Sequence, residues 1–326
     1  MGHEVTFFDC VTIPINKKIV PVKELIKKFI PQIVKIPLAV KLAKDKLNFS
    51  LREIVNEYRP EIVIVFKGTN ITSETLKYIK SKTGAKLLNW YGDSLISGGA
   101  KEFVEEISQY YDYFFIIDDL EVTKYVKIFS NKIYHLPFAC DPAYCREISL
   151  SKEEQRKYGC DVAFVGTITP SREKILLELT DFGLKIWAPQ KSVTNKNLIK
   201  FYQGIATAEE LIKIYNSAKI VLDIHFLFGS SLKIFNVTKR VFEVPACKGF
   251  VLTNYCEQLA SLYKINEEIV CYNSVEELKD KIKFFLKNDM LKKSISLKGY
   301  KKAITYHTWE KRFIKLFSLV NESGNC

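Results

Sequence analysis

The chain has 326 residues, of which 47% are hydrophobic and 26% charged, and its net charge is +12. This composition excludes a disordered chain, and the length is sufficient for two globular domains. There is no run of about eighteen uncharged apolar residues, as a membrane-spanning helix needs, and no signal-peptide pattern, so we expect a cytoplasmic protein. The positive charge indicates an anionic partner, which charge alone leaves open among nucleic acid, a membrane surface and phosphorylated small molecules.

Short β-branched and aromatic runs alternate with helical stretches, the pattern of βα units around parallel sheets. Strands are predicted in a first series at 3–8, 61–66, 86–90, 113–117 and 132–136, and in a second series at 161–165, 184–187, 219–222, 249–253 and 268–271. The polar stretch 137–158 between the two series predicts a linker. We therefore expect one α/β domain over 1–150, a second over 151–303, and a last helical segment over 304–326 that packs on a domain already formed.

The segment 17–46 mixes lysine with apolar residues and is interrupted by three prolines. Two interpretations remain open for it. It forms either a basic helical surface with one buried face or a surface that rests on an anionic membrane. The eight cysteines include no Cys-x-x-Cys pair, so neither a metal site nor a disulfide framework is predicted.

The turn after the predicted strand 161–165 contains Gly166, Thr167 and Arg172. Ligands of parallel α/β sheets bind beyond the carboxyl ends of the strands, where such a turn presents backbone N–H groups and a guanidinium to phosphate oxygens. A plain βα turn with Ser171 as helix cap is the alternative.

A second candidate is the stretch 236–253, read as a helix beginning near Asn236 and followed by a buried strand. Cations in the first turn, among them Arg240, oppose the helix dipole unless an anion binds there. Glu243 lies three residues further on the same face, so Arg240 could hold a diphosphate while Glu243 accepts hydrogen bonds from ribose hydroxyls. An ordinary Arg–Glu ion pair within the helix is the alternative.

Asp93 and His225 are the candidates for catalysis. Asp93 follows a predicted buried strand on a glycine-containing turn and could act as general base or orient an acceptor, with a turn or cap residue as the alternative. His225 closes the strand near 219–222 and could contact the donor. Because no Gly-x-Gly-x-x-Gly occurs, the sequence argues against a dehydrogenase.

The stretches 236–253, 255–259, 267–278 and 299–312 together resemble the C-terminal domain of the CgeB-like (spore maturation protein) glycosyltransferases, and weaker likeness extends over nearly the whole chain. The resemblance implies the GT-B architecture, in which two Rossmann-like domains face each other across a cleft and the C-terminal helix crosses back to the first domain. It implies a hexosyltransferase that uses a nucleotide-diphosphate sugar, with a UDP-sugar favoured, and needs neither a metal nor a cofactor. Glu243 would then bind the ribose, while Arg172 and Arg240, helped by Thr167 and Thr238, would hold the diphosphate.

Two departures from the family pattern bear on these expectations. Phe235 stands where many relatives carry a second glutamate near the donor sugar, and the first βα unit of the family is expected to be missing at the N-terminus. A catalytically silent sugar-nucleotide-binding or scaffold protein and a sugar-nucleotide epimerase of the same fold therefore stay open as alternatives. The acceptor, whether a glycan, a protein or a lipid-linked molecule, is not predicted, and no aromatic-basic motif supports nucleic acid as the partner.

Overall fold

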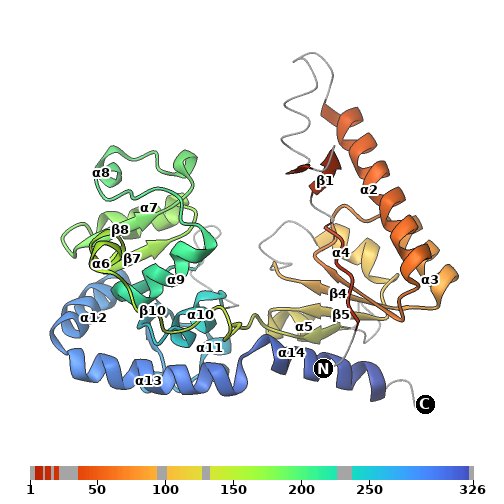
Figure 1. Ribbon diagram of the computed structural model, residues 1–326. Helices are drawn as coiled ribbons and strands as arrows, with labels where there is room; N and C mark the ends of the chain where they lie inside the picture. Colours follow the sequence, from red (N-terminus) through yellow and green to blue (C-terminus); the bar gives the residue numbers. More distant parts are fainter. Residues whose placement is uncertain are drawn as a thin grey trace. The chain divides into compact units, whose positions relative to one another are not determined.

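The computed structural model of the chain describes residues 4–9, 12–15, 18–21, 36–93, 101–126, 133–225 and 237–322 (Figure 1). The chain divides into two compact units. The N-terminal unit consists of Met1–Ile116 and Glu121–His135, and the C-terminal unit of Ile117–Leu120 and Leu136–Cys326.

The N-terminal unit contains a parallel sheet whose strands are neighbours in chain order: β3 (Ile62–Phe66), β4 (Lys86–Tyr91), β5 (Tyr113–Ile116) and β6 (Ile133–His135). Helices of this unit are α2 (Ile36–Tyr58), α3 (Ser73–Thr83), α4 (Lys101–Ser108) and α5 (Asp119–Tyr125). The core forms between these helices and one face of the sheet, where Leu76 and Ile79 of α3 pack with Leu87 of β4. Thr72 caps α3 by accepting a hydrogen bond from the backbone N–H of Thr75.

The predicted strand 3–8 was wrong for the part of it that the structure describes. Residues 4–9 belong to no strand, and the side chains of Val5 and Phe7 are 82% and 85% exposed. Instead β1 (Thr12–Ile15) pairs with β2 (Lys18–Pro21) in an antiparallel hairpin. The β-branched and aromatic composition of this segment suits a strand, but residues 4–8 have no partner strand among the parts of the chain that the structure describes.

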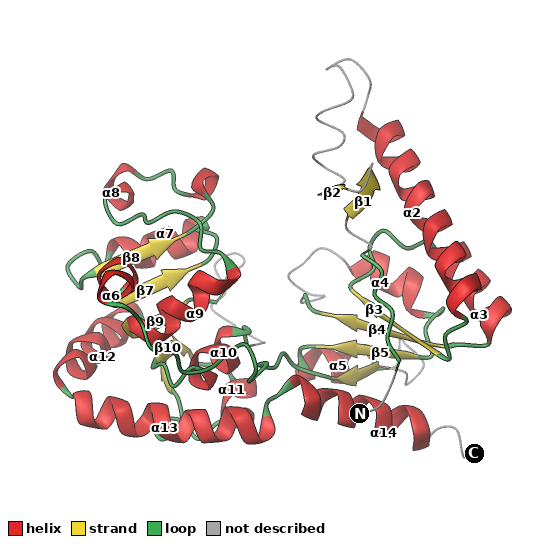
Figure 2. Cartoon of the chain, in the orientation of Figure 1, coloured by secondary structure: helices red, strands yellow, loops and turns green. Residues whose placement is uncertain are grey.

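The C-terminal unit contains a second parallel sheet (Figure 2). Its strands are β7 (Cys160–Val165), β8 (Leu184–Trp187), β9 (Ala218–Asp223), β10 (Val251–Asn254) and β11 (Val270–Tyr272). In the described residues they lie in the order β11-β10-β9-β7-β8. The chain order reverses between β7 and β9, and this is the switch point at which doubly wound sheets bind their ligands.

Successive residues of the strands point to opposite faces of this sheet and are buried on both, because helices cover both faces. Ala163 and Val221 pack on one face with α9, α10 and α11, whereas Val162 and Ile220 pack on the other with α7, α8 and α12. The helical elements of the unit, in chain order, are α6 (Lys152–Tyr158), α7 (Pro170–Leu177), η1 (Gln190–Ser192), α8 (Lys196–Ile199), α9 (Ala208–Ser217), α10 (Arg240–Ala246), α11 (Glu257–Leu262), α12 (Val275–Lys287), α13 (Asp289–Tyr306) and α14 (Trp309–Glu322).

Apart from the first, the predicted strands agree with the observed ones to within two residues at either end. The segment 137–158, expected as a linker, ends in helix α6, which begins with a capping box between Ser151 and Glu154. The packing of 304–326 on the N-terminal unit stays a prediction.

Among the residues described, no helix combines the length and apolar character needed to cross a membrane.

Candidate functional site

The carboxyl ends of β7 and β9 bring together most of the residues singled out in the C-terminal half. Strand β7 ends at Val165 and β9 at Asp223. The chain continues from these ends into Gly166 and His225, while Arg240 reaches the same place from the first turn of α10. The site therefore lies at the switch point of the sheet, where the turns after two neighbouring strands diverge.

Asp223 is the centre of this arrangement and is completely buried. Its Oδ1 accepts a hydrogen bond from Arg240 Nη1 at 2.6 Å, and its Oδ2 accepts from the hydroxyls of Thr238 at 3.0 Å and Thr253 at 2.9 Å. Burial opposes the ionisation of Asp223, but the Arg240 guanidinium and the His225 imidazole hold the pKa of the carboxyl well below its usual range. Asp223 is therefore a buried carboxylate whose charge is balanced locally.

Arg240 joins the two strand ends. Its Nε and Nη2 donate to the carbonyl oxygen of Val165 at 3.0 and 2.6 Å, while Nη1 binds Asp223. A guanidinium has five N–H donors, so one donor on Nη1 and one on Nη2 are left without an acceptor among the described residues. Nη2 also lies only 2.6 Å from the place where a Cβ on Gly166 would stand, and Gly166 has a φ of +149°. Only glycine permits both this backbone and this approach.

Arg172 is the second cation of the site and is buried, with 6% of its surface exposed. Its Nε and Nη2 donate to the carbonyl oxygen of Ile224 at 2.9 and 2.6 Å, and its Nη1 donates to that of Thr167 at 2.9 Å. Burial and the neighbouring Arg240 lower the pKa of Arg172 to about 10. Burial is the larger cause of this pKa shift, the Arg240 guanidinium adds to it, and the Asp223 carboxylate opposes it.

His225 lies at the end of β9 and is 2% exposed. Its Nε2 is 3.1 Å from the hydroxyl of Thr253 and 3.2 Å from Oδ2 of Asp223, and its backbone N–H donates to Oδ1 of Asn254. The other ring nitrogen, Nδ1, has no hydrogen-bond partner among the residues described. The ring is thus oriented from one side only.

The remaining predicted residues of the C-terminal half are Thr167, Thr238, Glu243 and Asn236. Thr238 turns inward onto Asp223, whereas Thr167 is exposed and contributes its carbonyl oxygen to Arg172. Glu243 is partly exposed on α10, where Oε2 accepts from Tyr215 at 3.4 Å and Oε1 lies 3.8 Å from Lys239 Nζ. Asn236, like Phe235, lies outside the described residues.

Asp93 belongs to the N-terminal unit, just after β4. It forms an ion pair with Lys67, which follows β3, and both side chains are about half exposed. This ion pair joins the turns that follow β3 and β4 at the carboxyl edge of the sheet.

Asp223, Thr253 and Asn254 are functional candidates that the sequence reasoning missed. Asp223 interrupts an apolar run, Ile220 to Ile224, in a strand that was correctly predicted. A lone acid in a buried strand requires a charged or hydrogen-bonding partner, and this was the signal available. Thr253 and Asn254 gave no such signal, because polar residues are common at strand ends.

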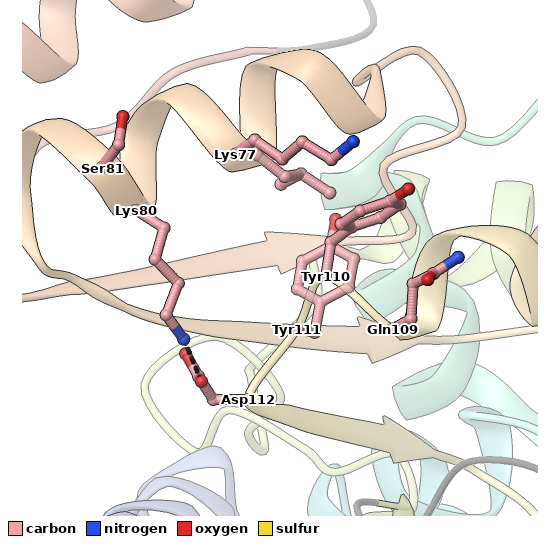
Figure 3. A pocket seen from close by; sticks show the side chains of 8 residues that line it. Lys77, Lys80, Ser81, Gln109, Tyr110, Tyr111 and Asp112 are labelled. Atoms are coloured by element: carbon pink, nitrogen blue, oxygen red, sulfur yellow. Dashed lines mark hydrogen bonds and ion pairs between the residues drawn. The ribbon is translucent and has the colours of Figure 1, made fainter.

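A hollow of about 430 Å³ lies in the N-terminal unit, between α3 and the turn before β5 (Figure 3). There Lys80 pairs with Asp112, and Lys77 lies 5.0 Å from the ring centroid of Tyr110. Asp112 Oδ2 also accepts from the backbone N–H of Leu87, so the hollow adjoins the edge where β4 and β5 begin. Parallel α/β sheets bind ligands at the opposite edge, and we place no donor site here.

Comparison with known proteins gives both sequence and structural similarity. Residues 170–318, slightly less than half of the chain, match the family model described as glycosyl transferase-like. No curated protein sequence matches the chain.

Several solved structures resemble most of the chain. A glycosyltransferase from Rickettsia africae is 16% identical with a TM-score of 0.61, over 92% of this chain and 87% of the other. Anabaena HepE (Alr3699), solved in complex with UDP-glucose, is 9% identical with a TM-score of 0.63, over 85% and 82%. Sucrose-phosphate synthase from Thermosynechococcus elongatus is 11% identical with a TM-score of 0.65, over 91% and 81%. The expected fold class is confirmed: the chain has the mixed α/β fold of the GT-B glycosyltransferases, and its C-terminal half is similar to the glycosyl transferase-like family.

Proposed function

We propose that this chain is a glycosyltransferase that takes a hexose from a nucleotide-diphosphate donor, with a UDP-sugar favoured, and transfers it to an acceptor hydroxyl without a metal ion. The observation that carries the proposal is the pair of guanidinium groups at the switch point of the C-terminal sheet, Arg172 buried and Arg240 largely buried, beside the buried carboxylate of Asp223. The similarity of residues 170–318 to glycosyl transferase-like proteins supports it.

The charge balance of the site favours an anionic ligand. Arg172, Arg240 and Lys239 bring three positive charges, and Asp223 and Glu243 bring two negative ones, so these five groups carry a net charge of +1. A diphosphate beside Gly166 would reduce the repulsion between the guanidinium groups and accept the two remaining donors of Arg240. As the sugar leaves, the same cations would stabilise the negative charge that develops on the nucleotide diphosphate.

Glu243 is the proposed partner of the ribose. It lies one turn beyond Arg240 on α10, and 18% of its side chain is exposed, in contrast to Asp223. A carboxylate can accept both ribose hydroxyls while the neighbouring arginine holds the phosphates. The Anabaena structures bound to UDP-glucose and to UDP support uridine as the base.

His225 and Asp93 are proposed to act on the transferred sugar and the acceptor. The bonds of His225 to Thr253 and Asp223 fix its ring and leave Nδ1 for a sugar hydroxyl. Asp93 would orient the acceptor hydroxyl or accept its proton. Replacement of either by alanine should reduce turnover by about 10²-fold or more. Transfer of sugar from a nucleotide-sugar donor would distinguish this enzyme from a protein that binds sugar nucleotides without catalysis.

The first experiment is calorimetric titration of the protein with UDP, GDP and ADP, in parallel with the double variant Arg240→Ala, Glu243→Ala. We expect UDP to bind and the double variant to bind none of the three. The matched control is Arg156→Ala, Glu153→Ala, which changes the same residue types at the same spacing on the exposed helix α6. Failure of the folded wild-type protein to bind any nucleotide would refute the donor site, and equal losses in both double variants would refute its location.

A further inference from the structure

Helix α13 carries apolar residues on its exposed face as well as on its buried one. Ile295, Gly299 and Ala303 pack inward. Met290 and Leu297 point outward with 83% and 46% of their surfaces exposed, and Ile304, a further seven residues along, is partly exposed. A spacing of seven residues places Met290, Leu297 and Ile304 in one row along the helix. We call these three residues the exposed row.

Lysines flank the exposed row. Between 283 and 306 the sequence has seven lysines and a single acid, Asp289, so this segment contributes +6 to the net charge of +12. Lys293, Lys298 and Lys301 are exposed on the outward face of α13. Lys293 pairs with Asp289 at 2.8 Å, whereas Lys298 and Lys301 have no carboxylate within 4.0 Å among the residues that the structure describes. The outward face of α13 is thus strongly cationic as well as apolar.

An apolar groove lies between α12 and α13, on a different side of α13 from the exposed row. It has a volume of about 710 Å³ and is lined by Phe284, Phe285, Leu291 and Ile295 among others. Phe284 and Leu291 at its rim are 49% and 45% exposed. The acids at the groove, Glu277 and Asp280, each pair with a lysine of α12, so they do not cancel the charge of α13.

We propose that the exposed row and its flanking lysines form a docking surface for a bilayer that carries anionic headgroups. Exposed aliphatic side chains gain by entering the boundary between headgroups and acyl chains, and lysines beside them bind the lipid phosphates. The fold does not explain the exposure of Met290 and Leu297 or the excess of lysine, because these side chains are exposed among the residues that the structure describes. The proposal does not depend on the proposed function.

Two other occupants fit the same surface less well. A two-stranded coiled coil needs a second apolar row three or four positions after the first. The positions three residues on hold Lys293 and Tyr300, and those four residues on hold Ser294 and Lys301, so neither spacing gives a continuous apolar row. Nucleic acid would attract the lysines but would not favour an exposed row of methionine, leucine and isoleucine. The bilayer is the partner that uses both features.

The test is flotation of the full chain with vesicles of phosphatidylcholine alone and with about a third phosphatidylglycerol, the charged lipid on which this kind of attraction depends. The wild-type protein should float with the anionic vesicles and much less with the neutral ones. The charge variant Lys293→Glu, Lys298→Glu, Lys301→Glu should lower the partition coefficient by about tenfold or more. Lys152→Glu, Lys196→Glu, Lys200→Glu makes the same change of charge at exposed lysines elsewhere in the unit and should lower it far less.

The apolar contribution is tested with Met290→Ser, Leu297→Ser. This variant should bind anionic vesicles more weakly and lose the part of the binding that survives high salt, which charge alone cannot give. The proposal is overturned if the two lysine variants lose binding equally, or if the serine variant binds as the wild type does. It is also overturned if the serine variant converts a wild-type dimer to a monomer in sedimentation, or if RNA binds the same lysines more tightly than the vesicles.

Discussion

Arg240 Nη1 donates to Asp223 Oδ1 over 2.6 Å, and this bond joins the first turn of α10 to the end of β9 inside the C-terminal unit. Both groups are largely or completely shielded from water, with 14% and 0% of their side chains exposed. Breaking one side of such a pair leaves a buried charge without compensation. The pair therefore supports the fold and orients the guanidinium at the same time.

Asp223→Asn should lower the free energy of unfolding by about 3 to 5 kcal/mol, because it leaves Arg240 buried without its counter-charge. Urea denaturation at pH 7 measures the change. The control Asp161→Asn breaks the exposed ion pair with Lys219 and should cost no more than about 1 kcal/mol. Equal losses in the two variants would mean that Asp223 is no more important than a surface acid.

The pH dependence of the same pair has a definite sign. The folded protein lowers the pKa of Asp223, so its contribution to stability is complete above the pKa of the unfolded chain, about 4, and is lost as the pH falls below that value. Asp223→Asn should remove this part of the acid sensitivity.

Gly166→Ala should lower both the stability and the affinity for UDP. The added Cβ would stand 2.6 Å from Arg240 Nη2, and the φ of +149° would be strained by about 1 to 3 kcal/mol in any other residue. Gly204→Ala is the control, because Gly204 has a φ of +101° but no atom within 4 Å of an added Cβ. Denaturation and calorimetry should show backbone strain in both variants and loss of UDP binding in Gly166→Ala alone. Loss of UDP binding in both would point to a general loosening of the unit.

The strands of the C-terminal sheet, and with them the position of the site, could be predicted from the sequence, because the pattern that marks a strand lies within a few consecutive residues. The runs that became β7, β9 and β10 are apolar, short and bounded by turns, so the carboxyl edge and the residues at it could be predicted. The partners of Arg172 and Arg240 could not. Both were expected to point at a ligand, but much of their hydrogen bonding is to the carbonyl oxygens of Ile224 and Val165, contacts that depend on how two strand ends diverge.

Glu243→Gln should lower the affinity for UDP by about tenfold, since a carboxylate is a stronger acceptor for hydroxyls than an amide. The affinity for 2′,3′-dideoxy-UDP should stay the same in the wild type and the variant, because this nucleotide lacks the two hydroxyls. Lys239→Gln tests whether loss of the 3.8 Å contact between Lys239 and Glu243 explains the effect. An equal fall for both nucleotides would show that Glu243 acts on the helix and not on the ribose.

His307 should make the free energy of unfolding depend on pH in a less acidic range than Asp223 does. It ends α13, and its Nε2 lies 3.1 Å from the carbonyl oxygen of Leu262. Its Nδ1 lies 3.3 Å from Arg312 Nη2, which leaves no room for a proton between them. Burial, and after it the charge of Arg312, lowers the pKa of His307 to about 4.

Because the pKa of His307 is lower in the folded state, the unfolded chain binds more protons between pH 6.5 and 4, and the folded state loses stability as the pH falls through that range. With an ordinary pKa of 6.5 in the unfolded chain, the loss between pH 7 and pH 5 should be about 2 kcal/mol. The measurement is the urea midpoint at both pH values for the wild type and for His307→Gln, whose amide can keep both hydrogen bonds without titrating. The variant is expected to be less stable at pH 7 but to change much less between the two pH values. If the wild type and the variant change equally, other groups cause the pH dependence and His307 is not protonated when the chain unfolds in this range.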